Sequence, residues 1–240
     1  MHKALEEDVI TSGDQAARTP ASAFVTLDYE NSRQFLWHWV KQGADYLETF
    51  LARYRTTRSK NLRVEDLKKK FLSDSTLRPA AFFFVYLLHK LRTFERSSSE
   101  KLIESEFGGF LLLDLCFGFC LVSDQLIKKE YRRRFRKMKV YFRDLALFLS
   151  RSAGLTLDKG KLQKVDGEFR GDLNKAVSDV LAGSVCSITL DPLEADIALC
   201  YGIRNQAAHS IASATPLVNR FDEVVQRVLS MLFLSVEELY

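Results

Sequence analysis

Apolar side chains recur every three to four residues along most of the chain, which is the spacing that places them on one face of an α-helix. The clearest stripe closes the chain: Leu217, Phe221, Val224, Val228, Leu232 and Val236. No stretch longer than SVCSITL, at 184–190, alternates as a β-strand would. The pattern therefore predicts an all-α fold.

The same spacing predicts helices over 32–54, 80–94 and 110–149, the last as one helix or as two joined near Lys128. Four glycines and several charges between 151 and 171 predict a loop there, with room for a short hairpin. A short helix should follow and end near Gly183.

Two helix starts are marked by capping residues. In Asp191-Pro192-Leu193-Glu194, an acceptor side chain precedes a proline, and a glutamate follows three residues after the cap. Thr215-Pro216 repeats the cap-then-proline order before the closing helix. We expect the two last helices of the chain to begin at these positions.

Composition sets the scale of the fold. With 240 residues, of which 47% are hydrophobic, the chain can bury a substantial core, and a disordered chain is excluded. We expect a flexible tail at 1–23 and a single all-α domain at 24–240, in which 24–75 forms an N-terminal helical extension. The net charge of +4 permits nucleic acid or another polyanion as a partner.

The cysteines and the apolar segments bear on the expected cellular location of the protein. No CxxC pair occurs among the four cysteines, which are Cys116, Cys120, Cys186 and Cys200. The first 15 residues are acidic and polar, and the apolar stretch 107–122 is too short for a membrane span and contains Asp114. We expect a cytoplasmic protein with no membrane contact, in which 107–122 is a buried core helix and Cys116 and Cys120 are packed thiols, not metal ligands.

The string YGIRNQAAHS at 201–210 holds the candidate site. Arg-to-His spacing alone decides little, because Arg33 and His38 show the same spacing inside an apolar helix, where His38 is better explained as a packed residue. Asn205 directly after Arg204 lowers the expected number of chance matches to roughly 0.02. On a helix, Asn205 and His209 lie on one face with Arg204 at its flank, so three polar groups could meet one phosphate.

IRNQAAHSI resembles the Arg-Asn-x-x-x-His signature of the HEPN superfamily (higher eukaryotes and prokaryotes nucleotide-binding), whose all-α members include many ribonucleases. The resemblance is specific over about ten residues, and the helix pattern over roughly 80–240 supports it. It implies a HEPN-like helical bundle, a metal-independent endoribonuclease without a cofactor, and a homodimer in which two motifs meet at the interface. The implied RNA product is a 2′,3′-cyclic phosphate.

The side chains suit this chemistry. An imidazole exchanges protons near neutral pH, so His209 is the candidate general acid or base. Arg204 would clamp the phosphate and stabilise the transition state through its forked donors. Asn205 would position a phosphate or ribose oxygen, or hold the histidine in orientation.

The basic run at 128–139 is the candidate RNA-binding surface, although such a run is often only a solvated helix face. Its candidate contacts are Arg132, Arg133, Arg136 and Lys139. Tyr131 and Phe135 fit the apolar stripe of the helix predicted over 110–149 and are expected in the core. Asp114 needs a partner in its apolar segment: Arg204 would make it an orienting residue, and a helix-terminal or surface position is the alternative.

The leading hypothesis is an endoribonuclease that acts as a toxin or an antiviral-defence effector, with a nucleotidyltransferase-type antitoxin or another defence protein as a possible partner. A non-catalytic helical module that binds RNA, nucleotide or protein is the alternative. A third hypothesis is a regulatory subunit whose site is silenced by its partner.

Overall fold

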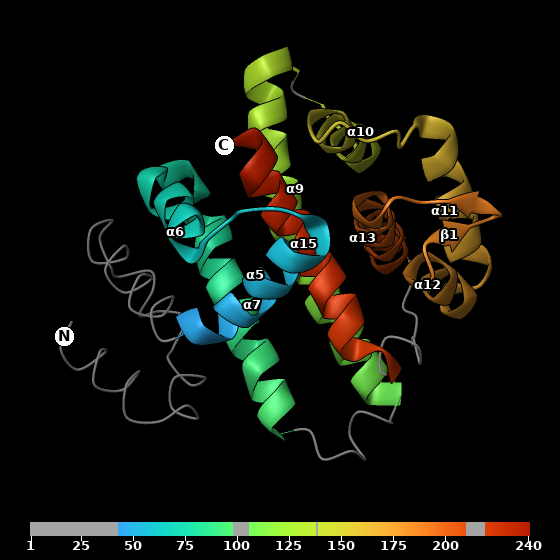
Figure 1. Ribbon diagram of the computed structural model, residues 1–240, viewed down its shortest axis with the longest axis horizontal. Helices are drawn as coiled ribbons and strands as arrows, with labels where there is room; N and C mark the ends of the chain where they lie inside the picture. Colours follow the sequence, from blue (N-terminus) through green and yellow to red (C-terminus); the bar gives the residue numbers. More distant parts are fainter. Residues whose placement is uncertain (1–42, 98–105, 138, 210–218) are drawn as a thin grey trace.

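The computed structural model describes residues 43–97, 106–137, 139–209 and 219–240. These residues form a bundle of α-helices with one small β-hairpin (Figure 1). The predicted all-α fold is confirmed. The predicted tail at 1–23, the start of the extension at 24–42 and the Thr215-Pro216 cap lie outside the described residues.

The elements before residue 98 are α5 (Ala44–Arg58), α6 (Val64–Ser73), the 3-10 helix η1 (Ser75–Leu77) and α7 (Arg78–Ser97). Those that follow are α9 (Glu106–Phe135), α10 (Phe142–Ser152), α11 (Lys159–Gly171), α12 (Leu173–Leu181), β1 (Ser184–Val185), β2 (Ile188–Thr189), α13 (Pro192–His209) and α15 (Phe221–Leu239). The strands pair antiparallel, with Ser184 opposite Thr189 and Val185 opposite Ile188.

Helix α9 is the long central element, and it contacts α7, α10, α13 and α15. Its segment Gly108–Phe135 is the one stretch among the described residues that could cross a membrane by length and composition, and 67% of its most apolar window is buried inside this structure. Most of the described side chains in the expected core helix at 107–122 are buried, but Phe110 and Asp114 are exposed. Cys116, Cys120 and Cys200 are buried free thiols.

The predicted segment 110–149 is two helices, and the break lies at 136–141 and not near Lys128. Arg136 ends the run of α9 with a positive φ of 53°. The next helix starts where Asp144 Oδ2 accepts a hydrogen bond from the backbone N–H of Tyr141, at 3.3 Å. A side-chain cap therefore sets the start of α10.

The predicted loop at 151–171 is wrong over most of its length, because α11 occupies 159–171. Asp158 caps this helix by accepting from the backbone of Lys161 at 2.7 Å. Three apolar side chains at helical spacing are buried: Leu162, Val165 and Phe169. Their burial outweighs the cost of about 1 kcal/mol that each helical glycine adds.

Helix α13 lies between the α9–α15 pair and the α11–α12 unit (Figure 1). Its predicted cap is confirmed: Asp191 Oδ1 accepts from the backbone of Leu193 at 2.8 Å, and Glu194 Oε2 accepts from the backbone of Asp191 at 3.2 Å. At Gly202 the neighbouring helix comes so close that a Cβ would lie 2.4 Å from the Phe169 ring. Glycine is required there for close packing.

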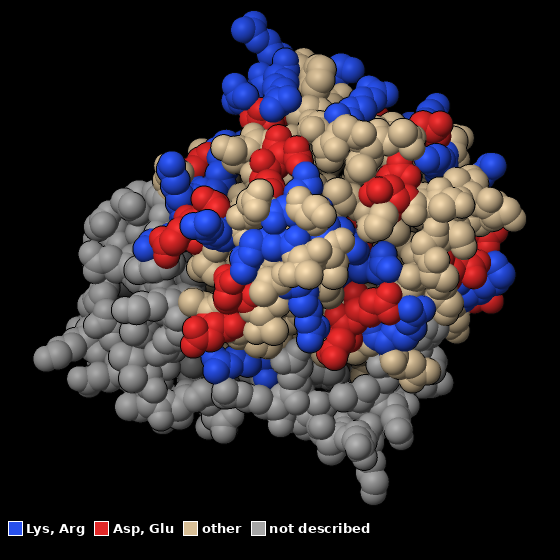
Figure 2. All heavy atoms as spheres, in the orientation of Figure 1, with Lys and Arg blue, Asp and Glu red and all other residues tan. Residues whose placement is uncertain are grey.

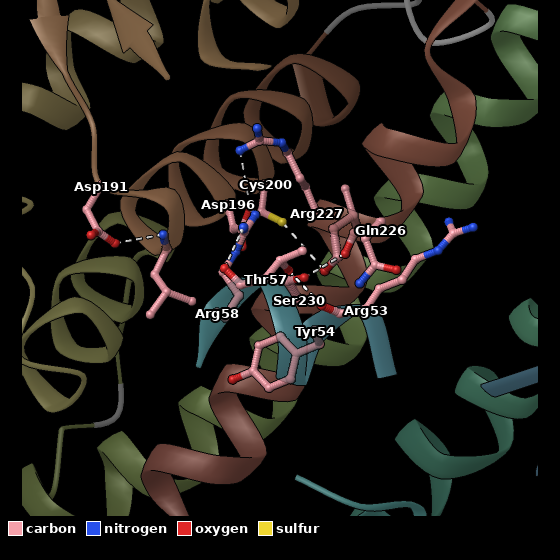
Figure 3. A network of polar contacts seen from close by, with 12 residues as sticks. Arg53, Tyr54, Thr57, Arg58, Asp191, Asp196, Cys200, Gln226, Arg227 and Ser230 are labelled. Carbon is pink, nitrogen blue, oxygen red and sulfur yellow. Dashed lines mark hydrogen bonds and ion pairs between the residues drawn. The ribbon is translucent and has the colours of Figure 1, made fainter. Parts of the chain in front are cut away.

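A buried ion pair ties α5, part of the expected N-terminal extension, to α13 and α15 (Figure 3). Asp196 has a fully buried side chain and accepts two hydrogen bonds from Arg58, both at 2.7 Å. Arg227 of α15 approaches the same carboxylate at 3.5 Å. The pairing residue on α5 lies 138 positions earlier in the chain, so no local pattern could predict this contact.

Candidate functional site

The last two turns of α13 carry the Arg-Asn-x-x-x-His string. Arg204 and Asn205 are half-buried, and His209 is the last residue of the helix. The side chain of His209 lies outside what the structure describes. Because α13 packs against α9, α10 and α11, the surroundings of Arg204 and Asn205 come from three other helices.

Arg204 is held against an aromatic pair. Its guanidinium carbon lies 5.1 Å from the centre of the Phe142 ring, at the start of α10. That ring is stacked on Tyr201 with centroids 6.1 Å apart and planes at 4°. The Nε of Arg204 is buried and has no hydrogen-bond partner within the described residues. A buried N–H without a partner is costly, so this donor is available to a bound anion.

Asp124 on α9 is a carboxylate that is close enough to Arg204 to feel its charge. Burial raises the pKa of Asp124, and the positive charges of Lys128, Arg204 and Arg132 act against that shift. Asp124, Lys128 and Arg132 are spaced four residues apart and so share one side of α9. The side that they share therefore faces the Arg204 end of α13.

Asp114 does not take part in this cluster. Its side chain is 65% exposed and forms an ion pair with Lys90 of α7 at 3.0 Å. Asp114 is therefore not a partner of Arg204 but a surface residue, which was the alternative interpretation. Asp124 was overlooked because the sequence does not show which side of α9 faces α13.

Asn205 is anchored from α11. Its Nδ2 donates to Asp166 Oδ1 at 3.0 Å, and the same carboxylate forms an ion pair with Arg170 at 2.9 Å. Burial raises the pKa of Tyr201, and a hydrogen bond with Asn205 opposes that shift. The amide is therefore fixed on two sides. Asp166 was missed because its helix was expected to be a loop.

Positive charge dominates this end of α13. Among the described residues, the charged groups that act on Asp124 or Tyr201, or pair with Asp166, are the cations Lys128, Arg132, Arg143, Arg170 and Arg204 and the carboxylates Asp124 and Asp166. Cations therefore outnumber carboxylates in this group of described residues. Arg143 also has a buried Nε without a hydrogen-bond partner in the described part of the chain. An anion with several acceptor oxygens is the ligand that this arrangement suits.

The predicted RNA-binding residues separate in space. Arg132 lies near Asp124, where its charge, like that of Arg204, favours the ionised carboxylate. Arg133 instead forms an ion pair with Glu130 at 2.6 Å and interacts electrostatically with Tyr240. Arg136 and Lys139 are exposed beyond the end of α9. Figure 2 shows Lys and Arg side chains gathered at the top of the molecule, where α9 ends.

The two aromatic residues of the same run also differ from each other. Tyr131 is half-buried, in agreement with its expected place in the core, but Phe135 is 51% exposed. The core assignment of Phe135 is therefore wrong.

No group of three or more His, Cys, Asp or Glu side chains among the described residues could hold a metal ion. Comparisons with family models, with curated proteins and with solved structures found no match to this chain.

Proposed function

We propose that this protein is a metal-independent endoribonuclease of the HEPN type, with Arg204, Asn205 and His209 in its site. The observation that carries the proposal is the buried Nε of Arg204, which has no hydrogen-bond partner among the described residues and lies beside an anchored Asn205 in a group rich in cations. A phosphodiester supplies an oxygen acceptor of the kind that the Arg204 Nε lacks in the described part of the chain.

In the proposed reaction, His209 removes the proton from a ribose 2′-hydroxyl, and the 2′-oxygen attacks the adjacent phosphorus. The bond from phosphorus to the 5′-oxygen breaks, and that oxygen takes up a proton from an imidazolium. The products are a 2′,3′-cyclic phosphate and a 5′-hydroxyl, so no water or metal enters this step. Arg204 stabilises the charge on the phosphorane.

Two copies of the motif supply the two proton transfers most simply, since one imidazole is then neutral and the other protonated. We therefore propose a homodimer in which the C-terminal ends of two α13 helices face each other. The setting that we propose is that of a toxin or an antiviral-defence effector held inactive by a partner protein.

The test is incubation of the purified protein with total RNA in EDTA. Arg204→Ala should lower cleavage by about 10²–10³-fold, the usual effect of removing one donor that stabilises a transition-state charge. His209→Ala should lower it at least as much. Arg53→Ala, which removes an exposed cation from α5, is the matched control and should cleave normally.

Cleavage that survives in both site variants, or that disappears with the chelator, would overturn the mechanism. A cyclic phosphate at the 3′ end of the fragments, detected by mass spectrometry, is the expected product. RNA binding without any cleavage would favour the alternative, a non-catalytic RNA-binding module.

A further inference from the structure

A second feature lies at the junction of α9 and α10. A groove of about 540 Å³ opens between the last turn of α9 and the outer face of α10. In Figure 1 the end of α9 projects at the top of the view, with α10 beside it. The groove combines aromatic and cationic side chains, which the Arg204 site does not use.

The aromatic side of the groove is built from three rings. Tyr131 and Phe135 have centroids 4.7 Å apart, and Phe148 meets them edge-on at 5.4 and 5.7 Å. The two neighbouring rings hold Phe135 in place although half of its surface is exposed. A fixed ring with an exposed face can stack on a flat partner without first being ordered.

Three cations line the same groove. Arg134 is oriented by Glu130 at 2.6 Å, with its guanidinium 5.3 Å from the Phe148 ring. Lys137 and Arg151 are exposed, and neither forms an ion pair within the described residues. The carboxylate in the lining, Asp144, is engaged at the start of α10.

We propose that this groove binds single-stranded RNA, with one base stacked on Phe135 and with phosphates at Lys137 and Arg151. The inference rests on the proposed ribonuclease function, because it names the form in which the substrate is held. Only an unpaired, splayed base can reach the exposed ring, whereas a base inside a duplex has both faces covered.

Helix α10 connects the groove to the proposed site. Phe142, its first residue, supports Arg204 from one face of the helix. Asp144, Phe148 and Arg151 line the groove from the opposite face, because they lie two, six and nine positions after Phe142 in the helix. Arg204 therefore lies on the other side of α10 from the groove, and a bound strand must pass round this helix, whose diameter is roughly 10–12 Å, for its following nucleotides to reach Arg204.

The test is fluorescence anisotropy with a labelled, unstructured 2′-O-methyl RNA of about 12 nucleotides. This probe has no 2′-hydroxyl to attack, so its binding does not depend on cleavage. Phe135→Ala should raise the Kd roughly tenfold, as expected for one lost base stack. Phe135→Leu should do the same although it keeps an apolar side chain, and Phe135→Tyr should bind like the wild type.

The matched control is Tyr86→Ala, which removes an aromatic ring of similar exposure, 53%, from α7 and should leave the Kd unchanged. Arg151→Ala should reduce the slope of log K against log salt by about 0.7, whereas Arg53→Ala should not change it. A matched duplex should bind wild type and Phe135→Ala equally.

The proposal is overturned if the wild type fails to bind the single strand, if Phe135→Leu binds like the wild type, or if Phe135→Ala weakens duplex binding as much. These outcomes are independent of the ribonuclease test. If Phe135→Ala loses RNA binding but the wild type cleaves no RNA, the groove proposal stands and the ribonuclease proposal fails. If the wild type cleaves RNA but binds it equally well without Phe135, the ribonuclease proposal stands and the groove proposal fails.

Discussion

Helix α13 carries two charged clusters that differ in how completely their groups are satisfied. Near its start, the buried carboxylate of Asp196 is held by the two hydrogen bonds from Arg58 and by Arg227, whose side chains are only 11% and 14% exposed. Near its end, Arg204 is half-buried, stacked on a ring, and leaves its Nε without a partner in the described chain.

The contrast separates a structural role from a binding role on one helix. The Asp196 cluster joins α5, α13 and α15, and its two arginines are offset by Asp196 and by Glu223, which also pairs with Arg227. Among the described residues its donors are therefore engaged within the protein. The Arg204 cluster has more cations than carboxylates and unsatisfied donors at a half-exposed position. Groups that are left unsatisfied inside the chain are those that a ligand can satisfy.

The largest expected effect is on stability at the Asp196 cluster. Asp196→Ala should lower the free energy of unfolding by about 3–5 kcal/mol, because it leaves two mostly buried arginines without their carboxylate. Arg204→Ala should change it by no more than about 1 kcal/mol, the contribution of its contact with Phe142. Urea unfolding followed by circular dichroism measures both, and equal losses would contradict the division of roles.

A smaller loss is expected at the contact that places α11 on α13. Gly202→Ala should cost about 1–3 kcal/mol, because the new methyl group would overlap the Phe169 ring and push the helices apart. Gly167→Ala is the matched control on the exposed side of α11, where nothing lies within 4 Å of the added Cβ. It should stabilise the protein by up to about 1 kcal/mol. A stability loss in the control would show that α11 tolerates no alanine at all.

The sequence predicts well what depends on neighbouring residues. Four consecutive residues specify the cap of α13, and the apolar stripe of α15 follows from helical spacing alone. Helix α11 was predicted as a loop because its glycines have low helix propensity. Only the burial of Leu162, Val165 and Phe169 favours a helix there. Burial of that kind depends on α13, which lies further along the chain.

The candidate site shows the same limit. Arg204, Asn205 and His209 share a helix and could be found from their spacing. Asp166 lies 39 positions from Asn205, and Asp124 lies on a helix whose facing side is set by packing. Long-range pairing of this sort leaves no local pattern, so the supporting residues could not be predicted.

The smallest expected effect concerns the support of Asn205. Asp166→Ala removes the acceptor at 3.0 Å from the Asn205 amide, and the loss of a hydrogen bond of about 1 kcal/mol should lower kcat for RNA cleavage roughly fivefold. KM should change little if the amide acts mainly in the transition state. Asp166→Asn, which keeps an acceptor oxygen, should restore most of kcat. Arg170→Ala removes the ion pair and keeps the hydrogen bond, so a loss as large as that of Asp166→Ala would assign the effect to charge and not to the position of Asn205.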